Sequence, residues 1–117
     1  MEVRLGFKEG EKVKVKMELD LDVQMGVGSL NGTGCQGYLP KGTTYDDIVR
    51  VFGGPQMTSS LDGKIQVEWY GRINGLQFTI YDYKSSVEPE RNTDWHIGGN
   101  YKFVAELVKL YLIEYKI

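Results

Sequence analysis

The chain of 117 residues has little of what disulfides and metal sites require. It contains one cysteine, Cys35, and one histidine, His96, so it cannot form an internal disulfide and offers no familiar zinc-ligand spacing. We therefore expect no metal site and no cofactor. No apolar run approaches membrane-spanning length, and the charged residues that open the chain are unlike a signal peptide. These absences predict a cytoplasmic protein without a membrane partner.

An excess of basic charge is also missing. The formal net charge is -2 and the pI is about 5.4, which argues against a protein held to long nucleic acid by phosphate neutralisation. Cys35 and His96 match no catalytic motif. No spacing links the candidate acid-base groups, so we expect that the protein is not an enzyme. These groups are Glu68, Asp82, Asp94 and His96.

Residues 65–84 have a pattern that predicts a β-hairpin. Asn74-Gly75 separates two strand-like runs, and a type I′ turn needs the positive φ that both residues tolerate. The turn sets the register and places Trp69 opposite Ile80. One face is then apolar up to its open end, and the other is polar and rich in tyrosine. The remaining pairs on the apolar face are Ile73 with Leu76, Gly71 with Phe78, Val67 with Asp82 and Ile65 with Lys84.

Residues 1–25 are predicted to form a second hairpin, because apolar and polar residues alternate on both sides of a turn at residues 8–11. Its second strand is expected to run without a break from Lys12 to Met25. Glycine then interrupts the alternation, and residues 26–43 are expected to form a Gly-rich loop. Residues 85–94 are expected to form an exposed loop.

Two helices complete the predicted α+β fold. Thr44 is placed to cap a helix at residues 44–53, and Asn100 to cap one at residues 100–112. The second helix has more apolar surface than one sheet face needs, which favours a homo-oligomer, a dimer or larger. Residues 112–117 either continue this helix or pair as a strand. The expected architecture is a single domain, residues 1–117, in which two antiparallel β-hairpins form a sheet and both helices pack on one of its faces.

Two glycine-rich strings offer candidate ligand groups. The segment with Thr33, Gln36 and Tyr38 can bring backbone amides close to an anion, or its glycines only turn the chain. Trp95 and His96 precede two glycines at the expected start of the last helix, which favours an anion site there. The alternative places Trp95 in the core and His96 on the surface.

The central hairpin offers further candidates. Tyr70, Tyr81 and Tyr83 on its polar face can stack on planar bases, although exposed strands also favour tyrosine for cross-strand packing. Asp82 and Lys84 lie at the open end of the apolar face. A charge there is expected to be paired or to lie at the rim of a cavity, and the two residues can also pair with each other.

The strings at residues 79–84, Thr-Ile-Tyr-Asp-Tyr-Lys, and at residues 95–99, Trp-His-Ile-Gly-Gly, are the most distinctive of the chain. Together with the Gly-rich segment and the first predicted helix, they resemble a group of small proteins encoded by tailed bacteriophages. The resemblance covers residues 32–110. Cys35 stands where that group's pattern has a bulkier apolar residue.

The resemblance implies an accessory protein that acts against bacterial defence in the host cytoplasm. Some such proteins are sponges, which bind cyclic nucleotide immune signals as oligomers without cleaving them. We expect a sponge of this kind, and an inhibitor of a host defence protein or a small hydrolase of the same ligand are the alternatives. In the expected site Tyr81 and Trp95 stack on the ligand, Lys64, Lys84 and His96 meet phosphate, and Thr33, Gln36 and Tyr38 supply hydrogen bonds.

Overall fold

The computed structural model describes residues 2–3, 15–16 and 20–116. Strand β1 (Glu2–Val3) pairs antiparallel with β2 (Val15–Lys16) in a two-stranded sheet. The predicted turn at residues 8–11 and most of the predicted long strand lie outside the described residues. The expectation of one unbroken strand is wrong where it is described, because residues 20–22 are not in a strand and β3 (Val23–Met25) belongs to another sheet.

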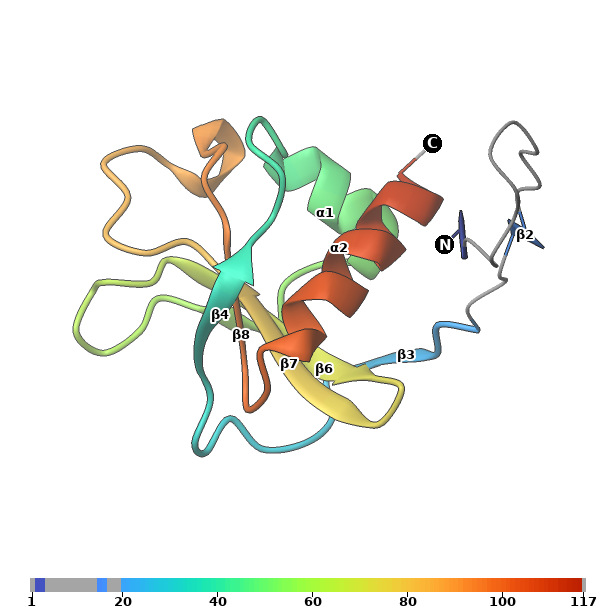
Figure 1. Cartoon of the computed structure of the whole chain (residues 1–117). Coiled ribbons are helices and arrows are strands. Elements are labelled where there is room, and N and C mark those ends of the chain that lie inside the picture. The colour runs from blue at the N-terminus through green and yellow to red at the C-terminus, as the bar shows by residue number, and fades with distance from the viewer. Residues whose placement is uncertain (1, 4–14, 17–19, 117) are drawn as a thin grey trace.

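The main sheet has six antiparallel strands and is open (Figure 1). Its order is β3, β6 (Val67–Ile73), β7 (Leu76–Tyr81), β8 (His96–Gly99) and β4 (Gly34–Tyr38). The short strand β5 (Met57–Thr58) pairs with β6 on the edge that β3 also uses. This sheet and the two helices confirm the predicted mixed α and β class.

The predicted register of the central strands is confirmed. Trp69 pairs with Ile80, as the position of the turn predicts. Asn74 and Gly75 have φ of 49° and 80°, the positive values that a two-residue turn between twisted strands requires. Successive side chains alternate between the two faces of the sheet. The apolar face carries Trp69, Phe78, Ile80 and Ile97, and the opposite face carries Glu68, Thr79, Tyr81 and Gly98.

Helix α1 (Tyr45–Phe52) begins at the predicted cap. The Asp47 backbone N–H donates to the Thr44 hydroxyl at 3.1 Å, and the Thr44 backbone N–H donates to the Asp47 carboxylate at 3.0 Å. This reciprocal pair is a capping box, which satisfies two backbone donors at the start of the helix. Gly53, with φ of 85°, follows the last turn.

Helix α2 (Phe103–Tyr115) begins later and ends later than predicted. Asn100 does not cap it, because its side-chain amide donates to the Asn31 carbonyl at 3.3 Å and Lys102 occupies the cap position. The residues from 112 to 115 continue the helix. The two glycines at positions 98 and 99 end strand β8 and are not the first turn of a helix. No helix in the described part of the chain is long and apolar enough to cross a membrane.

The core contains side chains from both helices and from the apolar sheet face. The Phe52 ring of α1 lies 5.9 Å from the Phe78 ring of β7 and 5.4 Å from the Tyr111 ring of α2, measured between centroids. Trp69 is fully buried, and its indole N–H donates to the Gly53 carbonyl at 2.8 Å. These contacts fix the central strands against the helices and leave the polar face turned away from this core.

Strand β4 was expected to be part of a loop. Its residues have no apolar alternation, and backbone pairing with β8 holds it in place, with Gly34 opposite Gly99 and Cys35 opposite Gly98. A Cβ on Gly37 would lie 2.9 Å from the Ala105 Cβ, so α2 packs directly on glycine backbone here. The glycines therefore allow close packing as well as turning the chain.

Residues 85–94, which were expected to form an exposed loop, contain one 3-10 turn, η1 (Pro89–Arg91).

Candidate functional site

The polar sheet face has a hollow of about 200 Å³. Strands β6, β7 and β8 and the segment that leads into β4 contribute to its lining. A Cβ on Gly98 would lie 2.5 Å from the Thr79 methyl carbon, so glycine at this position lets the strands approach and keeps the floor free of a side chain. The lining residues are Thr33, Gly34, Ile65, Glu68, Thr79, Tyr81, Tyr83 and Gly98.

Glu68 is the charged side chain of the lining. The Thr79 hydroxyl donates to its Oε2 at 2.5 Å. Burial raises the pKa of the Glu68 carboxyl, and the hydrogen bond from Thr79 offsets part of that effect. No described donor contacts the second Glu68 oxygen, and this oxygen is not fully buried, because every fully buried side-chain nitrogen or oxygen in the described residues has a partner. The carboxyl is thus held on one side and free to accept hydrogen bonds on the other.

Aromatic rings form one wall of the hollow. The Tyr81 ring stacks on the His96 imidazole, with centroids 5.2 Å apart and planes inclined by 28°. Tyr83 and Tyr38 also contact this imidazole, at centroid distances of 5.7 and 4.8 Å. Burial raises the pKa of the Tyr81 hydroxyl, and the neighbouring Cys35 raises it further. Tyr81 therefore stays neutral at physiological pH and presents a ring face and a hydroxyl.

Cys35 lies beside this wall and outside the lining. Its Sγ is 3.8 Å from His96 Nδ1 because β4 pairs with β8. The proximity of Cys35 also raises the pKa of the exposed Tyr38 hydroxyl. The sequence places Cys35 and His96 far apart, and the fold brings them together.

Two lysines lie at the end of the hairpin next to the hollow. Lys64 precedes the lining residue Ile65, and Lys84 follows the lining residue Tyr83. The Lys84 backbone N–H donates to the Lys64 carbonyl at 2.7 Å, so the two residues are neighbours. Lys84 Nζ lies 5.4 Å from the centroid of the Tyr83 ring, and Lys64 Nζ lies 3.9 Å from the Asp62 carboxylate. Both predicted phosphate-binding lysines thus lie together at an exposed position.

Asp82 is neither at a cavity rim nor paired with Lys84. It is fully buried, and its Oδ1 accepts the backbone N–H groups of Gln66 and Val67 at 2.8 and 3.1 Å. Its Oδ2 accepts the Gln66 side-chain amide at 2.8 Å. Three donors therefore compensate the buried carboxylate, which has a structural role at the end of the hairpin.

Six of the eight predicted ligand residues are not on the lining, and two of these six, Trp95 and Gln36, make their contacts elsewhere. Trp95 is 1% exposed, and its indole N–H donates to the carbonyls of Thr43 and Asn92 at 3.0 and 3.2 Å. Its ring packs in the core and offers no face to a ligand, so the expectation that it stacks on a base is corrected. The Gln36 side chain donates to the Gly99 carbonyl at 3.0 Å and joins β4 to the end of β8.

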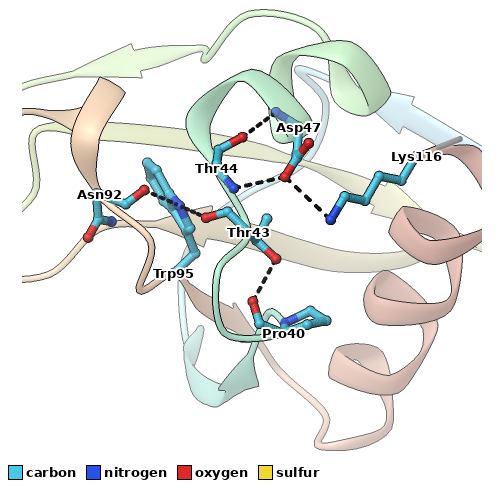
Figure 2. Close-up of polar contacts among 7 residues, drawn as sticks. All are labelled: Pro40, Thr43, Thr44, Asp47, Asn92, Trp95 and Lys116. Carbon is cyan, nitrogen blue, oxygen red and sulfur yellow. Dashed lines mark hydrogen bonds and ion pairs between the residues drawn. The ribbon is translucent and has the colours of Figure 1, made fainter.

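A larger hollow, of about 570 Å³, lies between α2 and the segment before α1. Its lining is mostly apolar, and its polar groups already have partners (Figure 2). The Thr43 hydroxyl donates to the Pro40 carbonyl at 2.6 Å, and Lys116 Nζ lies 3.4 Å from the Asp47 carboxylate. A ligand site needs a few polar groups that fix orientation. The smaller hollow has such groups, so we take it as the candidate site.

Thr33 and Tyr81 were predicted and are found on the lining, with Lys64, Lys84, His96 and Tyr38 around it. Tyr83, named above as a possible stacking residue but not placed in the expected site, is also on the lining. The remaining lining residues were not in the predicted site: Gly34, Ile65, Glu68, Thr79 and Gly98. The hairpin register could have identified Glu68, since it places this residue opposite Tyr81 on the polar face.

Among residues 2–3, 15–16 and 20–116, no three His, Cys, Asp or Glu side chains gather closely enough to hold a metal ion. The chain matches no family model, no curated protein and no solved structure. The choice of site therefore depends on the geometry alone.

Proposed function

We propose that the protein is a non-catalytic binder that sequesters a small nucleotide in the hollow, a cyclic nucleotide immune signal of a bacterial host. The observation that carries the proposal is the set of groups around one small space. Tyr81 and Tyr83 provide ring faces, Glu68 provides a hydrogen-bonding carboxyl, and Lys64 and Lys84 provide cations at the adjoining hairpin end. A planar base, its polar edge and an attached phosphate are bound by these kinds of group.

The size of the hollow favours a partly enclosed ligand. Its volume of about 200 Å³ lies below the roughly 300–1,000 Å³ of pockets that enclose whole drug-sized ligands. One ring system suits such a space, and the sugar and phosphate then lie outside it, toward Lys64 and Lys84. The proposal takes both helices to cover the apolar sheet face, so that the polar face stays accessible.

The proposed role as a phage anti-defence sponge draws on the two strings that carry the resemblance. The string at residues 79–84 supplies Thr79, Tyr81 and Tyr83 to the lining, and the string at residues 95–99 supplies Gly98. The most distinctive parts of the sequence thus meet at the hollow.

The proposed homo-oligomer is supported by apolar side chains of α2 that are more than half exposed, namely Phe103, Ile113 and Tyr115.

Release of ligand tests the proposal. The protein is purified from bacteria that make cyclic nucleotides and heated, and the released small molecules are identified by mass spectrometry. We expect an intact nucleotide, and we expect the same compound to raise the Tm of ligand-free protein. The proposal fails if no nucleotide is released and no member of a cyclic nucleotide panel shifts the Tm. A ligand cleaved during long incubation would favour the hydrolase alternative.

A matched pair of variants links the ligand to the hollow. Tyr83→Ser removes an exposed ring from the lining, and Tyr101→Ser removes an exposed ring outside it. We expect only Tyr83→Ser to reduce the Tm shift. Equal effects of the two variants would place the ligand elsewhere.

The second candidate, an inhibitor that binds a host protein, is favoured by the exposed apolar side chains of α2 alone. A pull-down from host lysate with the wild type and with Phe103→Ser tests it. A host protein retained by the wild type and lost by the variant would support an inhibitor, and capture unchanged by the substitution would count against it.

A further inference from the structure

Glu68 presents hydrogen-bond acceptors to the hollow. An ionised carboxylate has about four acceptor sites and no donor. The Thr79 hydroxyl uses one of the sites on Oε2. No described donor contacts Oε1, and this oxygen is not fully buried. Two neighbouring oxygens can therefore each accept one more hydrogen bond from a ligand.

Nucleobases differ in whether they can satisfy two parallel acceptors. The Watson–Crick edge of guanine has two adjacent donors, the ring N1–H and the exocyclic 2-amino group. Adenine presents one donor next to one acceptor, cytosine presents one donor followed by two acceptors, and uracil presents one donor between two acceptors. An acceptor placed opposite a carboxylate oxygen is repelled and loses its hydrogen bond to water. Guanine is the base whose edge matches an ionised Glu68.

We propose that the hollow selects guanine, with Glu68 accepting hydrogen bonds from N1–H and the 2-amino group. This proposal rests on the proposed nucleotide binding and names the base. Thr79 is a positioning residue in it, because its hydroxyl holds one carboxylate oxygen and so sets the direction of the other. Charge-assisted pairs of hydrogen bonds of this kind give both affinity and orientation.

The surroundings of Glu68 suit a guanine nucleotide. Tyr81 lies directly opposite Glu68 in the β6–β7 pairing, so an aromatic ring adjoins the carboxyl on the same sheet face. Ile65 and Tyr83 line the end of the hollow where Lys64 and Lys84 meet. In the proposal, a base paired with Glu68 directs its sugar and phosphate toward these two lysines.

Calorimetric titration tests the selection. The probes are the 3′,5′-cyclic monophosphates of guanosine, inosine and adenosine, because inosine has the N1–H and lacks the 2-amino group. The loss of one hydrogen bond to a charged acceptor lowers affinity roughly tenfold or more. We expect the guanosine compound to bind at least about tenfold more tightly than the inosine compound, and the adenosine compound to bind more weakly still.

The variant Glu68→Gln tests the assigned residue. A glutamine amide offers one acceptor and one donor, which complements adenine and opposes one of the two guanine donors. We expect the variant to lose guanosine binding by roughly tenfold to a hundredfold and to prefer the adenosine compound. Asp62→Asn is the control, since it removes the same charge from an exposed residue near Lys64. Thermal unfolding shows whether each variant is folded.

The outcomes separate the two proposals. Guanine selection would be overturned, and nucleotide binding left intact, by either of two results. The first is equal affinity of the wild type for the guanosine and inosine compounds. The second is that Glu68→Gln loses the same factor of affinity for all three compounds. If none of the three compounds binds the wild type, both guanine selection and binding of these purine nucleotides are wrong.

Discussion

The Asp82 carboxylate accepts the Gln66 backbone N–H at 2.8 Å and so ends the pairing of β6 with β7. The same oxygen accepts the Val67 N–H at 3.1 Å. The side chain thus takes the place of a carbonyl that a longer partner strand would provide. Two residues later Lys84 adopts φ of 51°, a value uncommon outside glycine, and the chain leaves the sheet. Asp82 therefore helps to determine where the lysines beside the hollow are held.

Substitution of Asp82 tests this role. Asp82→Ala removes the acceptor of the buried Val67 N–H and of two N–H groups of the half-buried Gln66, and we expect it to lower the free energy of unfolding by about 3 kcal/mol. Asp82→Asn keeps one acceptor oxygen for the backbone donors, so we expect a loss of roughly 1–2 kcal/mol. Urea denaturation measures both values. Small and equal decreases in the free energy of unfolding of the two variants would show that the carboxylate is not needed at this position.

Gly71 is expected to hold β3 against β6. A Cβ on Gly71 would overlap the Gln24 carbonyl oxygen of β3. Gly71→Ala should therefore destabilise the protein by about 1–3 kcal/mol and raise amide exchange in β3. Gly34→Ala is the matched control, because a Cβ there meets no atom within 4 Å. If the two alanine variants are equally stable, the close approach of β3 is wrong.

The cap of α1 should make stability depend on pH. The Thr44 backbone hydrogen bond holds the pKa of the Asp47 carboxyl below its usual value, with burial acting in the opposite direction. A carboxyl whose pKa is lowered by folding stabilises the protein above the pKa of the unfolded state. This stabilisation is lost as the pH falls through the folded-state pKa.

Asp47→Asn is therefore expected to cost about 1 kcal/mol at pH 7 and less at pH 3, where part of the stabilisation has been lost. Urea denaturation at the two pH values measures the difference. Asp46→Asn, in the same turn and exposed, is the control and should show a smaller change. A cost for Asp47→Asn that is the same at both pH values would contradict the assigned cause of the pKa shift.

The paired lysines should contribute to phosphate binding. Exposed ion pairs contribute about 0.2–1 kcal/mol each, so the double variant Lys64→Gln, Lys84→Gln is expected to weaken cyclic nucleotide binding by about twofold to thirtyfold. The affinity of the corresponding nucleoside should not change. Lys41→Gln with Lys102→Gln removes the same charge from exposed residues outside the lining. Equal weakening by both double variants would indicate a general charge effect.

The sequence predicts the parts of the fold that local chemistry determines. The Asn74-Gly75 turn and the alternation around it fix the register of the central hairpin, and Thr44 fixes the start of α1. Strand β4 could not be predicted in this way, because its residues give no apolar period and it is held by backbone pairing with β8, with Gly34 opposite Gly99. Asn100 is a good cap by residue type, but tertiary contacts engage it with Asn31.

The candidate site was predicted in part for a similar reason. Tyr81 and the two lysines could be recognised because the hairpin register places them on one face or at one end. Trp95 was misplaced, because a tryptophan beside glycines has the same sequence pattern whether it stacks on a ligand or fills the core. The role of Glu68 depends on its bond to Thr79 and on the hollow that Gly98 leaves open, and both require the folded sheet.

The most direct test of the central claim, that the hollow on the polar sheet face is the ligand site, is an NMR titration of ¹⁵N-labelled protein. The probe is the 3′,5′-cyclic monophosphate of guanosine, and the amide shifts are followed through the titration. We predict changes centred on Gly34, Thr79 and Gly98, with little change at Leu112 and Ile113 beside the apolar hollow. Changes centred on Leu112 and Ile113, or no change at any amide, would contradict the claim.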